Sequence, residues 1–168
     1  MIIENLTWPT TAPLPYGYSL RYFQSGDEKA WERIILEAFN RPRNFSKTIA
    51  SDDYFLPQRV LFVCHREAGP VATACAWHAP DTPDHVGYLY MVGALEAHRG
   101  KGLGYTVCVA ALRQMVRDSK TSAMLVTDSS RLAAIKTYLR LGFLPKPLHG
   151  NHLLVWKNVL RQLGMANQ

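Results

Sequence analysis

The stretch EAHRGKGLGYTV, from Glu96 to Val107, has three alternating glycines, Gly100, Gly102 and Gly104, behind an arginine and around a lysine. Glycine adopts positive φ readily and lets the main chain approach a ligand closely. A glycine-rich turn that opens a helix presents several backbone N–H groups, with the helix dipole behind them, to an anion such as a pyrophosphate. An ordinary surface turn is the alternative that the glycines alone leave open. The residues that would form the anion site are Arg99, Gly100, Lys101, Gly102, Leu103 and Gly104.

The segments on either side of this turn have the patterns of a strand and a helix. HVGYLYMVGAL (85–95) is apolar, rich in aromatic residues and too short for most helices, so it predicts a central strand. After the turn, apolar residues recur every four positions from Val107 to Met115. This spacing predicts an amphipathic helix from Leu103 to about Arg117.

The N-terminal half of the chain predicts an arm followed by a strand, a helix and a hairpin. Residues 1–17 are rich in proline and predict an irregular arm, and the domain proper is expected at 18–168. The expected helix has capping-box spacing between Ser25 and Glu28, and the hairpin is expected to turn at its Gly-Pro pair. These elements are expected at YSLRYF (18–23), SGDEKAWERIILEAF (25–39) and RVLFVCHREAGPVATACAW (59–77).

Further patterns complete the expected fold. A short helix is expected over 46–51, and the helix near the C-terminus has an N-cap serine and Gly142 at its end. Strands that alternate with helices predict a single α/β (α+β) domain with a mixed central β-sheet flanked by helices. The last three elements are a strand at SAMLVT (122–127), a helix at SSRLAAIKTYLRLGF (129–143) and a strand at HLLVWKNV (152–159).

The composition narrows the class of protein. The 168 residues, 48% of them hydrophobic, suffice for one well-buried core. No apolar run is long enough for a membrane helix and no signal peptide is evident, so we expect a cytoplasmic protein without a membrane partner. The cysteines lack zinc-binding spacing, so we expect buried free thiols at Cys64, Cys75 and Cys108 and no metal site.

The net charge of +6 suits an anionic partner. No dense lysine and arginine cluster interleaved with aromatic residues is present, so a nucleic acid partner is not expected. Edge strands and exposed aromatic residues make a homodimer an expectation.

Two familiar phosphate-binding patterns do not fit the glycine turn. A dinucleotide-binding Gly-x-Gly-x-x-Gly loop belongs near the start of its domain, and a P-loop requires Gly-Lys-Ser/Thr. Arg99, Gly102 and Gly104 instead resemble the (Gln/Arg)-x-x-Gly-x-(Gly/Ala) motif of the GCN5-related N-acetyltransferase (GNAT) superfamily, which binds acetyl-coenzyme A. AIKTYLRLGF (134–143) resembles a later helix of that family, and the resemblance covers 18–159 in element order. The matched positions in this helix are Ala134, Tyr138, Gly142 and Phe143.

The resemblance implies direct transfer of an acetyl or short acyl group from acetyl-coenzyme A, as cosubstrate, to a primary amine. It implies splayed central strands, with a backbone N–H near Val92 or Gly93 polarising the thioester carbonyl and Tyr138 donating a proton to the departing thiolate. The diphosphate is expected over residues 99–104. The pantetheine arm is expected to pair with the backbone of Met91, Val92, Gly93 and Ala94.

The general base and the acceptor site are left open by the sequence. Tyr88 and Tyr90 share one strand face and either line an acceptor pocket or pack in the core. Glu96 stands where the family commonly has proline, so a solvated carboxylate is the alternative to a base. Arg131 stands where many relatives have asparagine. A chain that lacks a base would be a non-catalytic acyl-coenzyme A sensor or interaction module. The candidate bases are Tyr88, Tyr90, His85, His78 and Glu96.

Overall fold

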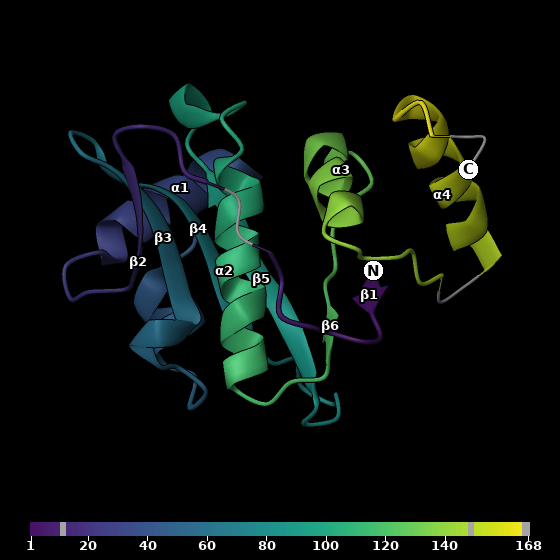
Figure 1. Cartoon of the computed structure of the whole chain (residues 1–168), viewed down its shortest axis with the longest axis horizontal. Helices are drawn as coiled ribbons and strands as arrows, with labels where there is room; N and C mark the ends of the chain where they lie inside the picture. Colours follow the sequence, from purple (N-terminus) through teal and green to yellow (C-terminus); the bar gives the residue numbers. More distant parts are fainter. Residues whose placement is uncertain (11–12, 148–149, 166–168) are drawn as a thin grey trace.

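A computed structural model describes residues 1–10, 13–147 and 150–165 of the chain (Figure 1). The centre is a six-stranded sheet in which only β5 and β6 run parallel, so the sheet is mixed, as the sequence predicts. The strands follow the order β1 (Ile2–Ile3), β6 (Ser122–Met124), β5 (Val86–Ala94), β4 (Gly69–Trp77), β3 (Val60–His65) and β2 (Tyr18–Tyr22).

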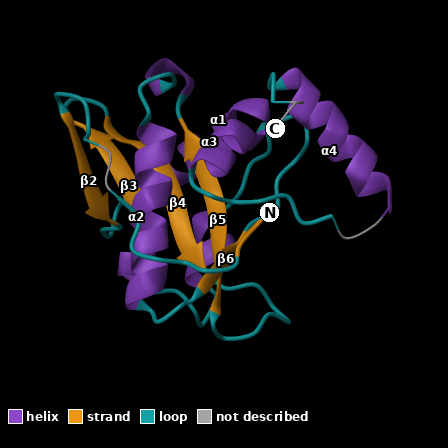
Figure 2. Cartoon of the chain, turned by 45° about the vertical axis from the view of Figure 1, so that its right-hand side comes forward, coloured by secondary structure: helices purple, strands orange, loops and turns teal. Residues whose placement is uncertain are grey.

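Helices cover both faces of this sheet. Figure 1 shows the helix over residues 103–117 on the near face of the sheet and the helix over residues 28–39 on the far face. A side chain at Gly87 of β5 would meet Met115 of the first helix, and one at Gly93 would meet Ala38 and Ile34 of the second. Figure 2 shows one of them, α2, running along the sheet. The helices are α1 (Glu28–Phe39), α2 (Leu103–Arg117), α3 (Leu132–Arg140) and α4 (Gly150–Gln162), with single turns η1 (Ser46–Ala50), η2 (Pro57–Arg59) and η3 (Glu96–His98).

The core forms where the apolar faces of α1 and α2 meet the sheet. Trp31, Ile34 and Ile35 of α1 are fully buried, as are Val107 and Ala111 of α2. The three cysteines are buried free thiols, as expected. None of the helices within the described ranges is long and apolar enough to cross a membrane.

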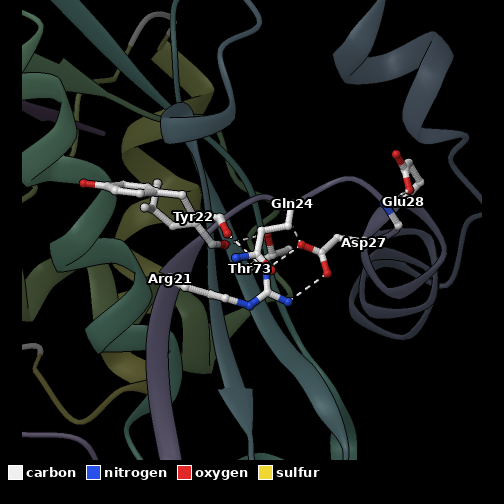
Figure 3. Close-up of polar contacts among 8 residues, drawn as sticks. Arg21, Tyr22, Gln24, Asp27, Glu28 and Thr73 are labelled. Atoms are coloured by element: carbon white, nitrogen blue, oxygen red, sulfur yellow. Dashed lines mark hydrogen bonds and ion pairs between the residues drawn. The ribbon is translucent and has the colours of Figure 1, made fainter.

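The start of α1 is held differently from the predicted capping box. Asp27 is the N-cap residue, and its carboxylate accepts two hydrogen bonds from Arg21, at 2.6 and 2.8 Å, and one from the Gln24 backbone N–H at 2.8 Å (Figure 3). Glu28 is the first helical residue, and its carboxylate accepts from the Gly26 N–H. Ser25 is therefore not the cap, because the buried Asp27 carboxylate joins β2 to the helix instead.

The predicted C-terminal strand at 152–159 is wrong, because these residues lie in α4. The strand that pairs with β6 on its outer side is instead β1, where Ile2 faces Met124. The N-terminal arm, expected to be irregular, therefore supplies an edge strand, and Ile2 also forms a bridge with Leu144.

Two smaller corrections concern turns. Gly69 and Pro70 already belong to β4, so the hairpin turns one residue or more before the predicted Gly-Pro pair. The N-cap of α3 is Arg131 rather than a serine, because Ser130 hydrogen-bonds the Asp128 carboxylate at 3.0 Å. Gly142, with φ 90°, ends this helical segment as predicted.

Candidate functional site

The pairing of β5 with both of its neighbours, β6 and β4, becomes irregular at the middle of β5. β5 pairs with β6 only from Val86 to Tyr88, so the edge of β5 beyond Tyr88 has no strand partner among the described residues. On the other edge, Thr73 faces Gly93 but Cys75 faces Tyr90, which inserts one extra residue into β5. This β-bulge and the open edge together form the splay that the resemblance implies.

The bulge decides which side chains face which helix. Met91 lies at the bulge with φ 46°, a left-handed conformation that few non-glycine residues adopt. Gly87 faces α2, whereas Gly93, six residues on, faces α1, so the bulge reverses the alternation of side chains. Tyr88 and Tyr90 precede the bulge and therefore lie on the α1 side of the sheet. The open backbone edge of β5 and the face that carries Tyr88 and Tyr90 thus both adjoin the bulge at Met91.

The glycine turn follows β5 directly and has the geometry of an anion cradle. Gly100 and Gly102 have φ 77° and 76°, which explains glycine at both positions. Gly102 is the N-cap residue of α2, so the first N–H groups of that helix open into the turn. A β-carbon at Gly100, Gly102 or Gly104 would meet no atom within 4 Å, so the turn faces open space.

A pocket of about 620 Å³ extends from this turn to α3. Its lining contains most of the residues that the sequence predicts for coenzyme binding, together with Tyr138. Met91, Lys101, Glu96, Tyr88 and Tyr90 do not line it. The predicted residues in the lining are Val92, Gly93, Ala94, Arg99, Gly100, Gly102, Leu103, Gly104 and Tyr138.

The pocket is electropositive. Arg99, Arg131 and Arg140 line it, and no acidic residue is among its described lining. The Arg99 guanidinium also donates to the carbonyl of Glu37 at 3.3 Å, which holds it beside the turn. Arginines around exposed backbone N–H groups suit a phosphorylated ligand. The volume, the bare turn and the charge therefore fit coenzyme A.

Tyr138 of α3 lines the pocket, with its ring packed against Phe143. It is 3% exposed, and its hydroxyl has no hydrogen-bond partner among the described residues. Burial, reinforced by the nearby Cys108, raises the pKa of Tyr138 well above its ordinary range. The phenol therefore stays protonated at neutral pH.

Arg131 bridges the splay from the start of α3. Its guanidinium donates to the backbone carbonyl of Val92 at 3.2 Å and lies 4.2 Å from the centre of the Phe39 ring. Val92 belongs to the segment that the resemblance assigns to the pantetheine arm. Arg131 thus occupies an acceptor atom on the open edge of β5, a contact that its mismatch with asparagine did not predict.

Two supports of the turn were not predicted from sequence. The Glu37 carboxylate accepts from the Glu96 backbone N–H at 2.9 Å, and the Tyr18 hydroxyl lies 2.8 Å from Nδ1 of His98. Burial, followed by the charge of Lys101, lowers the pKa of His98. These partners are 59 and 80 positions apart in sequence, so no local pattern could reveal them.

The candidate bases lie outside the pocket. The rings of Tyr88 and Tyr90 stack with their centres 5.5 Å apart, and the centre of the Trp77 ring lies 6.4 Å from that of Tyr90. These three rings form an aromatic wall. Burial raises the pKa of both tyrosines. Asp52 accepts from the Trp77 indole at 3.1 Å and lies 3.8 Å from His78, at the end of the same wall.

The two remaining candidates are further from this aromatic wall. His85 is exposed and immediately precedes β5. Glu96 is exposed at the start of η3, beside the glycine turn. The structure therefore does not bring a predicted base into the pocket, and the assignment of the base remains a prediction.

Comparison with known proteins gives a consistent family. A sequence model described as the Acetyltransferase (GNAT) family matches residues 28–143. The mycothiol acetyltransferase of Paenarthrobacter aurescens is 32% identical over 142 residues, which cover 79% of this chain and 44% of that protein. The mycothiol acetyltransferase of Corynebacterium aurimucosum is 37% identical over 98 residues, which cover 54% of this chain and 32% of that protein.

The fold comparison agrees with these relatives. The crystal structure of a GCN5-related N-acetyltransferase from Sphaerobacter thermophilus matches with a TM-score of 0.69 and 23% identity. This match covers 86% of the present chain and 47% of that chain and supports the fold. The chain thus spans less than half the length of each of these three proteins. The family match over most of the chain, with the glycine turn and Tyr138 inside it, shows that this protein belongs to the GNAT family of acetyltransferases.

Proposed function

We propose that this chain transfers an acetyl group from acetyl-coenzyme A to a primary amine of a small molecule. The observation that carries the proposal is the pocket in which the glycine turn, the open edge of β5 and Tyr138 meet. Its length runs from an anion cradle to a protonated phenol. An acyl thioester of coenzyme A has its phosphates and its reacting carbonyl at corresponding ends.

Each part of the pocket has a role in this proposal. The N–H groups from Gly100 to Gly104 bind the diphosphate, and Arg99 adds charge at the rim. The open edge of β5 from Val92 to Ala94 pairs with the amides of the pantetheine arm. A backbone N–H of this edge donates a hydrogen bond to the thioester carbonyl oxygen and so polarises the carbonyl. The low dielectric of the site strengthens this hydrogen bond.

Tyr138 completes the transfer by giving its proton to sulfur. The neutral amine nitrogen attacks the thioester carbon, the carbon–sulfur bond breaks, the thiolate takes the phenolic proton, and the proton that the amine loses passes to water. A phenol whose pKa is raised by burial remains protonated until the thiolate forms, and it then recovers a proton from solvent. We assign the acceptor to the wall formed by Tyr88 and Tyr90, on the α1 side of the bulge. The names of the curated relatives, mycothiol acetyltransferases, support a small-molecule acceptor.

The binding half of the proposal is tested by calorimetric titration with acetyl-coenzyme A, with NADH and ATP as competing nucleotides. Gly102→Asp should weaken binding at least tenfold, because it puts a side chain and a negative charge into the cradle at a positive φ. Gly69→Asp is the matched control, since Gly69 has φ 69° and open surroundings but lies in the hairpin. Equal affinity of the two variants would remove the cradle from the proposal.

The catalytic half is tested by thiol release across a panel of small-molecule amines and peptide N-termini. Selective turnover of a small amine supports the proposal. Loop-dependent binding without turnover of any amine would instead favour the acyl-coenzyme A sensor. Preferential turnover of peptide N-termini would contradict the acceptor class.

A further inference from the structure

A second pocket lies between α2 and the β2 edge of the sheet. Its volume is about 330 Å³, and it shares no lining residue with the pocket described above. It draws on α2, β2, β3 and the arm that precedes β2. The lining consists of Leu14, Leu20, Arg21, Tyr22, Leu61, Thr106, Val109, Ala110, Arg113 and Arg117.

The inner wall of this pocket is apolar. Leu61, Val109 and Ala110 form part of it, and all three are otherwise buried in the fold. Leu20 and Tyr22 are 42% and 41% exposed, which is high for large apolar side chains that line a cavity. An apolar group of a ligand would cover this surface and gain hydrophobic free energy.

The charge at the pocket is positive and only partly compensated. Arg21 is paired with Asp27, toward which Figure 3 shows its side chain turned. Arg113 and Arg117 lie one turn apart on α2, and neither has an ion-pair partner within the described parts of the chain. The described lining contains no aspartate or glutamate. Two guanidinium groups thus stand beside an apolar cavity without a carboxylate.

The contacts of these arginines leave donors free for a ligand. Arg113 uses Nε to donate to the Pro9 carbonyl at 2.8 Å, and Arg117 uses Nη1 to donate to the Tyr22 hydroxyl at 3.1 Å. Both guanidinium groups also lie over the Trp8 ring, at 5.0 and 5.2 Å from its centre. These bonds, to the arm from Arg113 and to β2 from Arg117, each use one N–H of the arginine. The terminal nitrogens of Arg113 have no partner among the described residues, and a planar fork of this kind binds a carboxylate with two parallel bonds.

We propose that this second pocket binds an amphipathic carboxylate, with the carboxylate on Arg113 and Arg117 and the apolar tail against Val109 and Ala110. The site is separate from the acetyltransferase pocket. It combines a concave apolar wall with a small number of fixed polar groups, which is the usual make-up of a small-molecule site. The proposal rests on this geometry alone and does not depend on the proposed function.

The test is a titration of the full chain with octanoate, followed by calorimetry and by the amide shifts of Thr106, Val109 and Ala110. Octanol, which lacks the charge, and acetate, which lacks the tail, are the comparison ligands. Octanoate should bind about tenfold more tightly than either, because a charge-assisted pair and apolar burial act together. Its affinity should fall with added salt. Saturating coenzyme A should not displace it.

Two variants separate the two halves of the site. Arg113→Gln with Arg117→Gln should reduce octanoate binding to the level of octanol, whereas Lys157→Gln with Arg161→Gln, an equal loss of two charges on α4, should not change it. Ala110→Leu keeps both arginines and the arm but fills the wall of the pocket, so it should also abolish binding. Octanoate affinity that equals that of octanol, or that survives both pocket variants, would overturn the proposal. Displacement by coenzyme A would overturn it as well.

Discussion

Tyr138 is the residue whose chemistry and packing can be separated most cleanly. Tyr138→Phe removes only the hydroxyl, which has no hydrogen-bond partner among the described residues, and keeps the ring contact with Phe143. If the hydroxyl protonates the thiolate, kcat should fall about 100-fold. The KM for acetyl-coenzyme A and the thermal midpoint should change little, because the ring remains packed.

The matched control for this prediction is Tyr105→Phe, since Tyr105 lines the same pocket at the glycine turn. Tyr105 belongs to α2 and has no part in the proton transfer assigned to Tyr138 of α3, so its loss of a hydroxyl should leave kcat unchanged. An unchanged kcat in Tyr138→Phe would show that the tyrosine is a packing residue only. A pH profile of kcat in the parent chain gives a second readout, because a phenol with a raised pKa stays active as a donor through neutral pH.

At the scale of elements, local sequence patterns predicted the helices and strands better than they predicted which strand pairs at the edge of the sheet. The strand, glycine turn and helix around Gly102 follow from residues within about a dozen positions of one another, and α2 has the predicted bounds. The position beside β6 is decided by a contact between residues 122 positions apart in the chain, Ile2 with Met124. No periodicity at 152–159 can report that this position is already taken.

The same difference holds within the candidate site. The turn and Tyr138 carry motifs and were predicted, whereas the bulge at Met91 depends on the register of β4 against β5. The contact of Arg131 with Val92 depends on how far α3 lies from the open edge. Both are tertiary features, and neither has a pattern in one stretch of sequence.

The bridge between α3 and β5 gives a prediction at this scale. Arg131→Met keeps apolar contact with Phe39 but frees the Val92 carbonyl, on which we expect pantetheine to pair. The affinity for uncharged S-acetylpantetheine should therefore rise about fivefold, the value of one competing hydrogen bond. The affinity for acetyl-coenzyme A should rise less, because a cation near the phosphates is also lost.

Isothermal titration with both ligands measures this difference. Arg140→Met is the control, since Arg140 lines the pocket but makes no hydrogen bond to β5 among the described residues. This substitution should lower the affinity for the charged ligand only. Equal changes in the two affinities for Arg131→Met would show that Arg131 does not compete for the strand edge.

For the whole molecule, α2 connects both pockets to the core. Its N-terminal turn opens into the pocket at the glycine turn, and Thr106, Val109 and Ala110 line the second pocket. Its remaining apolar residues, among them Val107 and Met115, are buried against the sheet. A helix fixed in this way holds both sites at constant geometry, so variants at one site can be tested without unfolding the other.

The stability of the whole molecule should depend on pH through Asp27. Burial alone would raise the pKa of this carboxyl, but the hydrogen bonds from Arg21 and from the Gln24 backbone outweigh burial and lower it below its ordinary value of 3.8. A lowered pKa in the folded state means that the ionised carboxylate stabilises the fold above pH 3.8 and that this stabilisation is lost as the pH falls through the folded-state pKa.

Asp27→Asn should therefore lower the free energy of unfolding by about 3 kcal/mol at pH 7, because it leaves Arg21 without its partner. Urea denaturation at pH 7 and at acidic pH measures the effect, and the difference between the parent chain and Asp27→Asn should shrink on acidification. Glu28→Gln, at the partly exposed neighbouring carboxylate, should show a much smaller loss at pH 7. A loss equal to that of Asp27→Asn would argue against the buried pair as the source.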